Sequence, residues 1–202
     1  MLRAPLQNVS RETMDCLTHF EQLVLKWTRK INLVSQSDAA LIWERHILDS
    51  VQVFDHAPIG DHWLDIGSGG GFPGIVAAIL SQKGTPIRRF TLVDSDQRKC
   101  VFLRTAAREL GLKVTVIAER VQDLAPIGSD IFTARALSSL DSLLHHAERH
   151  LSPTGAALFP KGATWEREHL DAKKNWSYDL EVIESKTNSA ATILKIKELS
   201  RV

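Results

Sequence analysis

The sequence predicts an α/β fold, in which a mostly parallel, Rossmann-like sheet with an antiparallel terminal strand follows an N-terminal helical extension. A strand, a glycine-rich turn and a helix follow one another between residues 62 and 80. Strand and helix patterns then alternate over most of the chain. Two late strand patterns, at 180–183 and 192–196, have no strong helix between them, which is typical of a hairpin-like antiparallel edge.

Residues 1–57 are expected to form the helical extension, and residues 58–202 the α/β core. Apolar residues recur at spacings of three and four from Leu17 to Val34, as in an amphipathic helix. A second helix is expected from about residue 38 to residue 54, before a proline and a glycine break the chain. We expect the extension to cover one face of the sheet, with contact to a partner as an added role.

The core elements are marked by composition and by turn residues. Strand segments are rich in β-branched and apolar residues, and Gly111 is the expected C-cap of a helix. Strands are expected at 62–64, 90–94, 114–118, 130–134 and 156–159, and helices at 75–80, 97–110, 139–150 and 164–174.

The glycine-rich turn predicts a site for a nucleotide-like ligand, because glycines let backbone N–H groups approach it closely. Residues 65–74 are Asp-Ile-Gly-Ser-Gly-Gly-Gly-Phe-Pro-Gly. They fit the dinucleotide pattern G-x-G-x-x-G and, from Asp65, the D-x-G-x-G-x-G motif of S-adenosylmethionine methyltransferases. Asp65 favours the second pattern, because its charge opposes the pyrophosphate of NAD but suits the ammonium and sulfonium of S-adenosylmethionine. A tight turn that binds nothing is the remaining alternative.

A second acid, Asp94, ends the next expected strand. A carboxylate at this place accepts hydrogen bonds from a ribose diol, about 20 residues after the glycine loop. NAD and S-adenosylmethionine proteins share this spacing, so Asp94 supports a ribose without separating the two ligands. The alternative is that Asp94 with Ser95 caps the following helix, and both roles are compatible.

Composition excludes several classes of protein. The chain has 202 residues, 44% of them hydrophobic, and a formal net charge of +1, so gross charge gives no nucleic-acid signal. Cys16 and Cys100 are far apart and lack metal-ligand spacing, as expected of free thiols in a reducing compartment. No signal-peptide pattern and no apolar run of about 20 residues is present, so we expect a cytoplasmic protein without membrane spans or metal.

Several short segments occur in a specific order along the chain. They are Asn32–Ser35, Arg45–Ser50, Asp65–Gly74, Asp94–Ser95 with Arg98–Lys99 and Phe102–Leu103, Arg120–Gln122, Ala134–Ala136 and Lys161–Gly162. This ordered set, over about residues 20–196, resembles the bacterial RsmG (GidB) family of small-subunit ribosomal RNA methyltransferases. The resemblance implies a class I S-adenosylmethionine methyltransferase fold. It also implies methyl transfer to N7 of guanine 527, in the 530 loop of 16S rRNA. In this family, loss of the enzyme confers low-level streptomycin resistance.

The resemblance and the motifs together give a set of candidate cofactor-binding residues. Gln122 stands where the family usually has glutamate, and Thr133 where it usually has serine. A neutral amide still hydrogen-bonds an adenine edge, so we expect cofactor binding to survive the exchange. The candidates are Asp65, Gly67, Gly69, Gly71, Phe72, Gly74, Asp94, Val121, Gln122 and Arg135.

Methylation at guanine N7 needs no general base, because N7 carries a lone pair and no proton. The protein must then align the reactants and hold the RNA. Arg120, Arg135 and Lys161 each follow a core strand, so they are expected to converge on the ligand crevice as the candidate catalytic residues. Solvated or salt-bridged surface charges are the alternative. We expect Lys161→Ala to lower methylation more than cofactor affinity.

Other residues have a structural interpretation beside the functional one. His46 and Asp49 could form a local pair or approach the cofactor, and a helix-to-core hydrogen bond is the preferred alternative. Trp165 and Trp176 lie in a polar context, so we consider them for exposed contacts.

Three functions remain open at this point. The leading hypothesis is a monomeric methyltransferase whose partner is 16S rRNA, in the small subunit or its precursor. A methyltransferase for a small molecule or a protein, and a non-catalytic or NAD-dependent nucleotide-binding module, are the alternatives.

Overall fold

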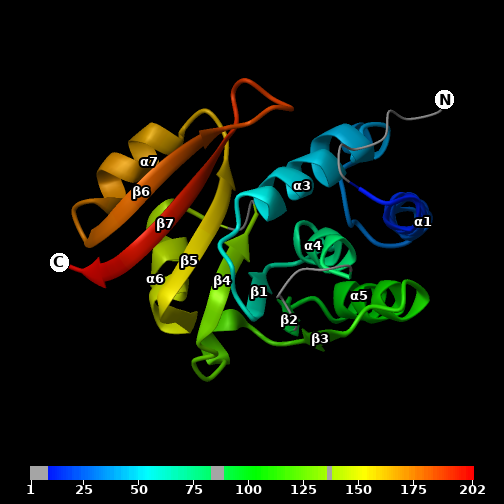
Figure 1. Ribbon diagram of the computed structural model, residues 1–202, viewed down its shortest axis with the longest axis horizontal. Helices are drawn as coiled ribbons and strands as arrows, with labels where there is room; N and C mark the ends of the chain where they lie inside the picture. Colours follow the sequence, from blue (N-terminus) through cyan, green and yellow to red (C-terminus); the bar gives the residue numbers. More distant parts are fainter. Residues whose placement is uncertain (1–8, 83–88, 136–137) are drawn as a thin grey trace.

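A computed structural model describes residues 9–82, 89–135 and 138–202, so Ala136 of the segment 134–136 lies outside the described residues. Its centre is a seven-stranded sheet with the strand order β3-β2-β1-β4-β5-β7-β6 (Figure 1). Strands β1 to β5 pair in parallel, and β7 is antiparallel to both β5 and β6. The predicted fold class, a mostly parallel sheet ending in an antiparallel strand, is confirmed. The strands are β1 (His62–Ile66), β2 (Arg89–Val93), β3 (Val114–Ile117), β4 (Ser129–Ala134), β5 (Leu151–Lys161), β6 (Trp176–Glu184) and β7 (Thr192–Arg201).

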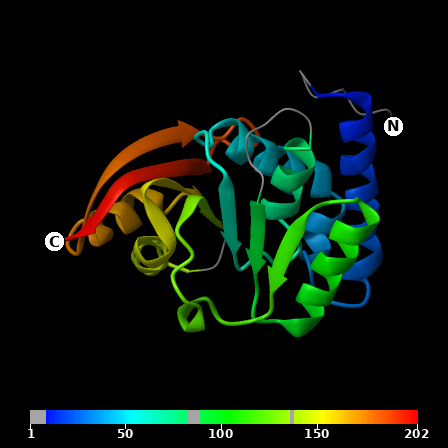
Figure 2. The ribbon, with the colours of Figure 1, turned by 60° about the horizontal axis from the view of Figure 1, so that its bottom comes forward.

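Helices cover both faces of the sheet. One buried cluster joins α1, α4 and α5, and another joins α6 and α7 to strands β4 to β7. Successive strand residues alternate between the second of these clusters and a third, which contains Trp63, Ile131 and Leu158 on the opposite face, as expected for a sheet that is buried on both sides. Figures 1 and 2 show α1 beside α5, far from the end of β7. The helical elements are α1 (Arg11–Thr28), α2 (Gln36–Ala39), η1 (Trp43–Ile47), α3 (Leu48–Asp55), α4 (Gly74–Leu80), α5 (Gln97–Glu109), η2 (Val121–Asp123), α6 (Leu140–His150) and α7 (Trp165–Ala172).

Three element predictions need correction. Helix α1 ends at Thr28, and Val34 is buried from the turn that follows rather than from the helix. The helix expected over 38–54 is divided into α2, the π-helical turn η1 and α3. Strand β5 begins directly after α6 and runs through Pro153 and Gly155, which were expected to lie before it. Periodicity detects buried positions well, but it does not detect where the backbone leaves helical geometry.

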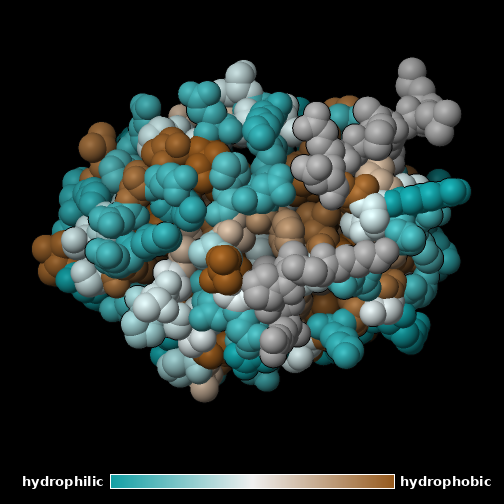
Figure 3. All heavy atoms as spheres, viewed as in Figure 1, coloured by the Kyte–Doolittle hydropathy of each residue, from teal (hydrophilic) through white to brown (hydrophobic). Residues whose placement is uncertain are grey.

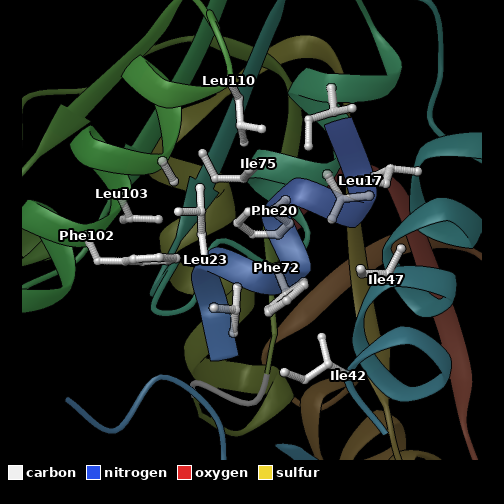
Figure 4. Packing of buried hydrophobic residues seen from close by; sticks show 14 of the residues in the cluster. Leu17, Phe20, Leu23, Ile42, Ile47, Phe72, Ile75, Phe102, Leu103 and Leu110 are labelled. Atoms are coloured by element: carbon white, nitrogen blue, oxygen red, sulfur yellow. The ribbon is translucent and has the colours of Figure 1, made fainter. Parts of the chain in front are cut away.

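Helix α1 packs on the glycine-rich turn after β1. The Phe20 ring lies 5.2 Å from the Phe72 ring and 6.4 Å from the Phe102 ring, between their centroids (Figure 4). Leu17 and Ile75 belong to the same buried cluster. The extension therefore shares a core with the turn that carries the ligand motif, and the division at residue 57 stays a prediction.

The surface shown in Figure 3 is mostly hydrophilic, with hydrophobic side chains interspersed. Trp176 does not contribute to it: only 2% of this residue is exposed, and its indole N–H donates to Asp141 Oδ1 at 2.9 Å. The expected exposed position of Trp176 is therefore wrong, because it lies on the inner face of β6. Within the described ranges, every helix is too short or too polar to span a membrane.

Candidate functional site

A cavity of about 790 Å³ lies at the carboxyl ends of β1, β2, β3 and β4. In open α/β sheets this edge holds the ligand crevice, at the point where the strand order reverses. The walls come from the glycine-rich turn, the ends of three strands, α6 and the N-terminal extension. The lining residues are Leu33, His46, Gly67, Ser68, Gly69, Gly70, Phe72, Val93, Asp94, Ser95, Asp96, Lys99, Glu119, Arg120, Val121, Gln122, Arg135, Ser138, Ser142 and His146.

Gly67 and Gly69 form the cavity side of the turn. Their φ angles are 61° and 50°, in the left-handed region that favours glycine. A Cβ atom on Gly69 would lie 3.6 Å from the Gly67 carbonyl oxygen, which is ordinary contact. Backbone conformation, rather than space, therefore requires glycine here.

Gly71 and Gly74 face the core. A Cβ atom on Gly71 would lie 2.7 Å from Ile75 Cγ1, and one on Gly74 would lie 2.2 Å from Leu92 Cδ2. Neither glycine is among the cavity-lining residues. These two positions let α4 and α1 pack against the sheet, so they support the turn from behind.

Asp65 is completely buried beneath the turn and does not line the cavity. Asp65 Oδ1 accepts a hydrogen bond from the Thr133 hydroxyl at 2.7 Å. The Thr133 hydroxyl oxygen in turn accepts a hydrogen bond from the Trp63 indole N–H at 2.9 Å. Burial raises the pKa of Asp65 to about 6, against the opposing effect of the Thr133 hydrogen bond. In the structure, the Asp65 carboxyl connects β1 to β4 through Thr133. Its contact with a cofactor ammonium stays a prediction.

Asp94 lines the cavity and holds the glycine-rich turn. Its Oδ2 accepts from the Gly69 N–H at 2.8 Å, and its Oδ1 accepts from the Asp96 N–H at 2.8 Å. Asp96, rather than Asp94 with Ser95, caps α5 by accepting from backbone N–H groups of its first turn. The capping interpretation of Asp94 is therefore wrong. Each carboxylate oxygen accepts more than one hydrogen bond, so Asp94 keeps capacity for a ligand hydroxyl.

The end of β3 supplies the opposite wall. Glu119, Arg120, Val121 and Gln122 all line the cavity. Arg120 and Gln122 are exposed, and Val121 is half-buried. These residues and the end of β2 form a mixed polar and apolar surface, which suits a base and its sugar.

Arg135 lies at the end of β4 with a geometry that favours an anionic ligand. Its Nη1 donates to His46 Nδ1 at 2.6 Å and to the Arg45 carbonyl oxygen at 3.4 Å. The guanidinium carbon lies 5.1 Å from the centroid of the Phe72 ring. Among the residues described, no carboxylate lies within ion-pair distance of Arg135. A half-buried cation without an ionic partner is costly, and an anion in the cavity would offset that cost.

His46 is neutral in this arrangement. Arginine only donates, so His46 Nδ1 accepts and the ring proton lies on Nε2. Burial and the nearby Arg135 charge lower the pKa of His46 to about 4. His46 thus lines the cavity and contacts Arg135, whereas Asp49 accepts from the Thr187 hydroxyl. The two residues do not form the local pair that their spacing allowed.

Lys161 does not line the cavity, unlike Arg120 and Arg135. Its Nζ donates to Glu168 Oε2 at 2.8 Å and to the Ser138 carbonyl oxygen at 2.9 Å. The predicted convergence of three cations therefore holds for two of them. The role of Lys161 in contacting RNA stays a prediction.

Sequence reasoning did not identify the contribution of α6 or of several single residues. Ser138, Ser142 and His146 line one wall, and Leu33 and Lys99 line others. No motif marks the three α6-side residues, whose only signal is the serine–leucine start of an amphipathic helix. Leu33 and Lys99 lie in the segments 32–35 and 98–99 of the family resemblance, but neither was predicted to line the site. In the described part of the chain, no three His, Cys, Asp or Glu side chains lie together as metal ligands.

Comparisons with known proteins agree with this geometry. A family model described as rRNA small subunit methyltransferase G matches residues 13–195. Proteins named ribosomal RNA small subunit methyltransferase G are similar to the chain. That of Ruegeria sp. (strain TM1040) is 52% identical over 96% of this chain and 95% of its own length. That of Gluconobacter oxydans (strain 621H) is 44% identical over 98% of this chain and 100% of its own.

Solved structures share the fold at low identity. A SAM-dependent methyltransferase from Aquifex aeolicus has a TM-score of 0.59 at 16% identity, covering 85% of this chain and 97% of its own. M. jannaschii TYW2 in complex with AdoMet has a TM-score of 0.60 at 14% identity, covering 87% of this chain and 80% of its own.

The cavity fits S-adenosylmethionine. Its volume lies within the range of about 300–1,000 Å³ found for small-molecule sites. Asp94 offers acceptor atoms of the kind that a ribose diol needs, and Arg135 offers a cation of the kind that a carboxylate needs, so the polar groups present fit this cofactor. The chain belongs to the rRNA small subunit methyltransferase G family and is an S-adenosylmethionine-dependent methyltransferase.

Proposed function

We propose that this enzyme transfers a methyl group to N7 of guanine 527, in the 530 loop of 16S rRNA. S-Adenosylmethionine supplies the electrophilic sulfonium methyl group. Family membership over residues 13–195 supports ribosomal RNA as the substrate, in the small subunit or its precursor. The proposal includes a monomeric enzyme acting in the cytoplasm.

The protonation and hydrogen bonding of His46 are the observation that supports N7 as the methylated atom. An exocyclic amine or a hydroxyl must lose a proton during methylation, but N7 has none. His46 is the cavity histidine next to Arg135, and its Nδ1 already accepts from Nη1 of that residue. With the proton on Nε2, the ring offers no free lone pair, so it is unsuited to act as a general base. Methylation at N7, which needs no general base, fits the part of the cavity that His46 and Arg135 form.

Arg135 is assigned to the cofactor rather than to the base. Positive charge develops on guanine as N7 attacks, and a cation close to the ring would oppose it. A carboxylate of the cofactor gains from the same cation, and Asp94 and Gln122 would bind the ribose and adenine. Arg120 and Lys99 also line the cavity, and we assign them to RNA phosphates. Positioning is thus the main contribution of the protein.

The test is methylation of small ribosomal subunits from a strain that lacks this activity, with labelled S-adenosylmethionine and mapping of the product. We expect label as 7-methylguanosine at one site in the 530 loop. Label at another base, or none on subunits, precursor particles and free rRNA while the cofactor still binds, would overturn the proposed substrate.

A further inference from the structure

An ion pair behind the cavity connects β5 to α7. Lys161 Nζ lies 2.8 Å from Glu168 Oε2, and only 10% of the lysine side chain is exposed. The same ammonium donates to the Ser138 carbonyl oxygen at 2.9 Å. At least two of its three N–H donors are therefore used within the protein.

Glu168 extends this connection to the first turn of α6. Its Oε2 also accepts from the Leu140 N–H at 2.8 Å, and its Oε1 accepts from the Thr164 hydroxyl at 3.2 Å. The Leu140 N–H is one of the donors that a helix start leaves without an intrahelical partner. Burial alone would raise the pKa of Glu168, but the hydrogen bonds from Lys161 and Leu140 lower it. A carboxylate at this end of α6 is also favoured by the helix dipole.

The backbone held in this way belongs to a cavity wall. Lys161 binds the carbonyl of Ser138 and Glu168 binds the N–H of Leu140, so they fix the chain on both sides of Ser139, the N-cap of α6. Ser138 lines the cavity, and so do Ser142 and His146. The last two are four residues apart on α6 and therefore share one helix face. A shift of the helix start would move all three.

We propose that Lys161 and Glu168 are positioning residues for the cofactor site: they hold the start of α6 against the cavity, and, in place of the RNA contact predicted from the sequence, Lys161 contacts neither cofactor nor RNA. This role rests on cofactor binding, which is measured without RNA. Its test is therefore independent of the identity of the methylated base.

A double-mutant cycle on the full chain tests the proposal. Lys161→Met, Glu168→Leu and the double variant are compared by titration calorimetry with S-adenosylmethionine. Each single change should raise the Kd about five- to tenfold, and the double variant should lie within about twofold of the weaker single, because the residues act as one unit. Lys161→Arg, which keeps the ion pair, should restore the Kd to within about twofold of the parent.

A matched control separates positioning from a general loss of stability. Lys195 pairs with Glu181 at 3.0 Å, and its side chain is 16% exposed, but neither residue lines the cavity. Lys195→Met should leave the Kd unchanged. Melting temperatures of all variants identify any that fail to fold; Glu168→Gln, which keeps the shape, then takes the place of Glu168→Leu and should raise the Kd.

Two results would overturn the proposal. In the first, Lys161→Met leaves the cofactor Kd unchanged but lowers kcat/KM for ribosomal subunits, as a direct RNA contact would. In the second, the effects of Lys161→Met and Glu168→Leu on the Kd multiply in the double variant, which shows that the residues act separately.

Discussion

Arg135 follows β4 and Lys161 ends the neighbouring parallel strand β5, yet their surroundings differ completely. Arg135 faces the cavity beside a neutral histidine and has no ion-pair partner in the described part of the chain. Lys161 has a carboxylate at 2.8 Å and a carbonyl oxygen at 2.9 Å, and it lies behind the cavity wall. A cation that the protein leaves unpaired is available to a ligand, whereas a cation that the protein has paired shapes the wall. Position at the end of a strand does not distinguish the two.

The largest effect is expected at the unpaired cation. Arg135→Met should weaken S-adenosylmethionine binding about 30-fold, because a hydrogen-bonded charge contact is worth about 2 kcal/mol. Arg135→Lys should recover only part of this, since lysine lacks the planar fork. Titration calorimetry measures both Kd values.

Decarboxylated S-adenosylmethionine provides the control for Arg135. If the guanidinium binds the cofactor carboxylate, Arg135→Met should change the Kd of this analogue little. An equal loss of affinity for both ligands would contradict the contact between Arg135 and the cofactor carboxylate. An unchanged Kd for S-adenosylmethionine with slower methylation would indicate that Arg135 contacts the RNA instead.

Asp94 combines the two situations, because it is paired with the protein and also faces the cavity. Asp94→Ala should weaken S-adenosylmethionine binding about tenfold, through the ribose and through the Gly69 N–H that it leaves without an acceptor. Asp94→Asn, which keeps one acceptor oxygen, should lose less. The analogue without ribose hydroxyls separates the two causes. Equal losses for it and for the full cofactor would contradict the ribose assignment.

The sequence was sufficient for the fold class and for one side of the site. The glycine-rich turn and Asp94 are local signals, since a strand end, a positive φ angle and a carboxylate acceptor for the Gly69 N–H each need a particular residue type. Local signals did not separate Gly67, which lines the cavity, from Gly74, which packs on Leu92. The motif is the same for both, because glycine is required either where the backbone has a positive φ angle or where there is no room for a Cβ atom.

The other side of the site depends on tertiary contacts that no local pattern encodes. His46 meets Arg135 across 89 positions of sequence, and Glu168 meets the start of α6 across 28. The spacing of Lys161 and Glu168, seven residues apart with a turn between them, does not predict an ion pair. Trp176 likewise looks exposed from its polar neighbours, but alternation along β6 turns it inward.

The smallest effect on the cofactor is expected at His46, where the comparison of paired and unpaired cations is most easily tested by pH. His46→Gln keeps an acceptor for Arg135, so it should change the S-adenosylmethionine Kd by only about threefold or less. The folded-state pKa of about 4 lies below the usual histidine pKa of 6.5. The unfolded chain therefore binds this proton more readily, and His46 lowers the stability of the fold as the pH falls from 6.5 to 4.

Asp65 acts in the opposite direction over nearly the same window. Its pKa rises from 3.8 to about 6, so the folded protein holds the proton more tightly and loses stability as the pH rises from 4 to 6. The two slopes partly cancel in the parent chain. In urea unfolding between pH 4.5 and 7, these two groups together should therefore change the free energy of unfolding of the parent chain only weakly with pH. His46→Gln should gain stability relative to the parent as the pH falls, and Asp65→Asn should gain relative to it as the pH rises. A His46→Gln curve parallel to the parent would mean that His46 is not held neutral, and that Arg135 tolerates a second cation beside it.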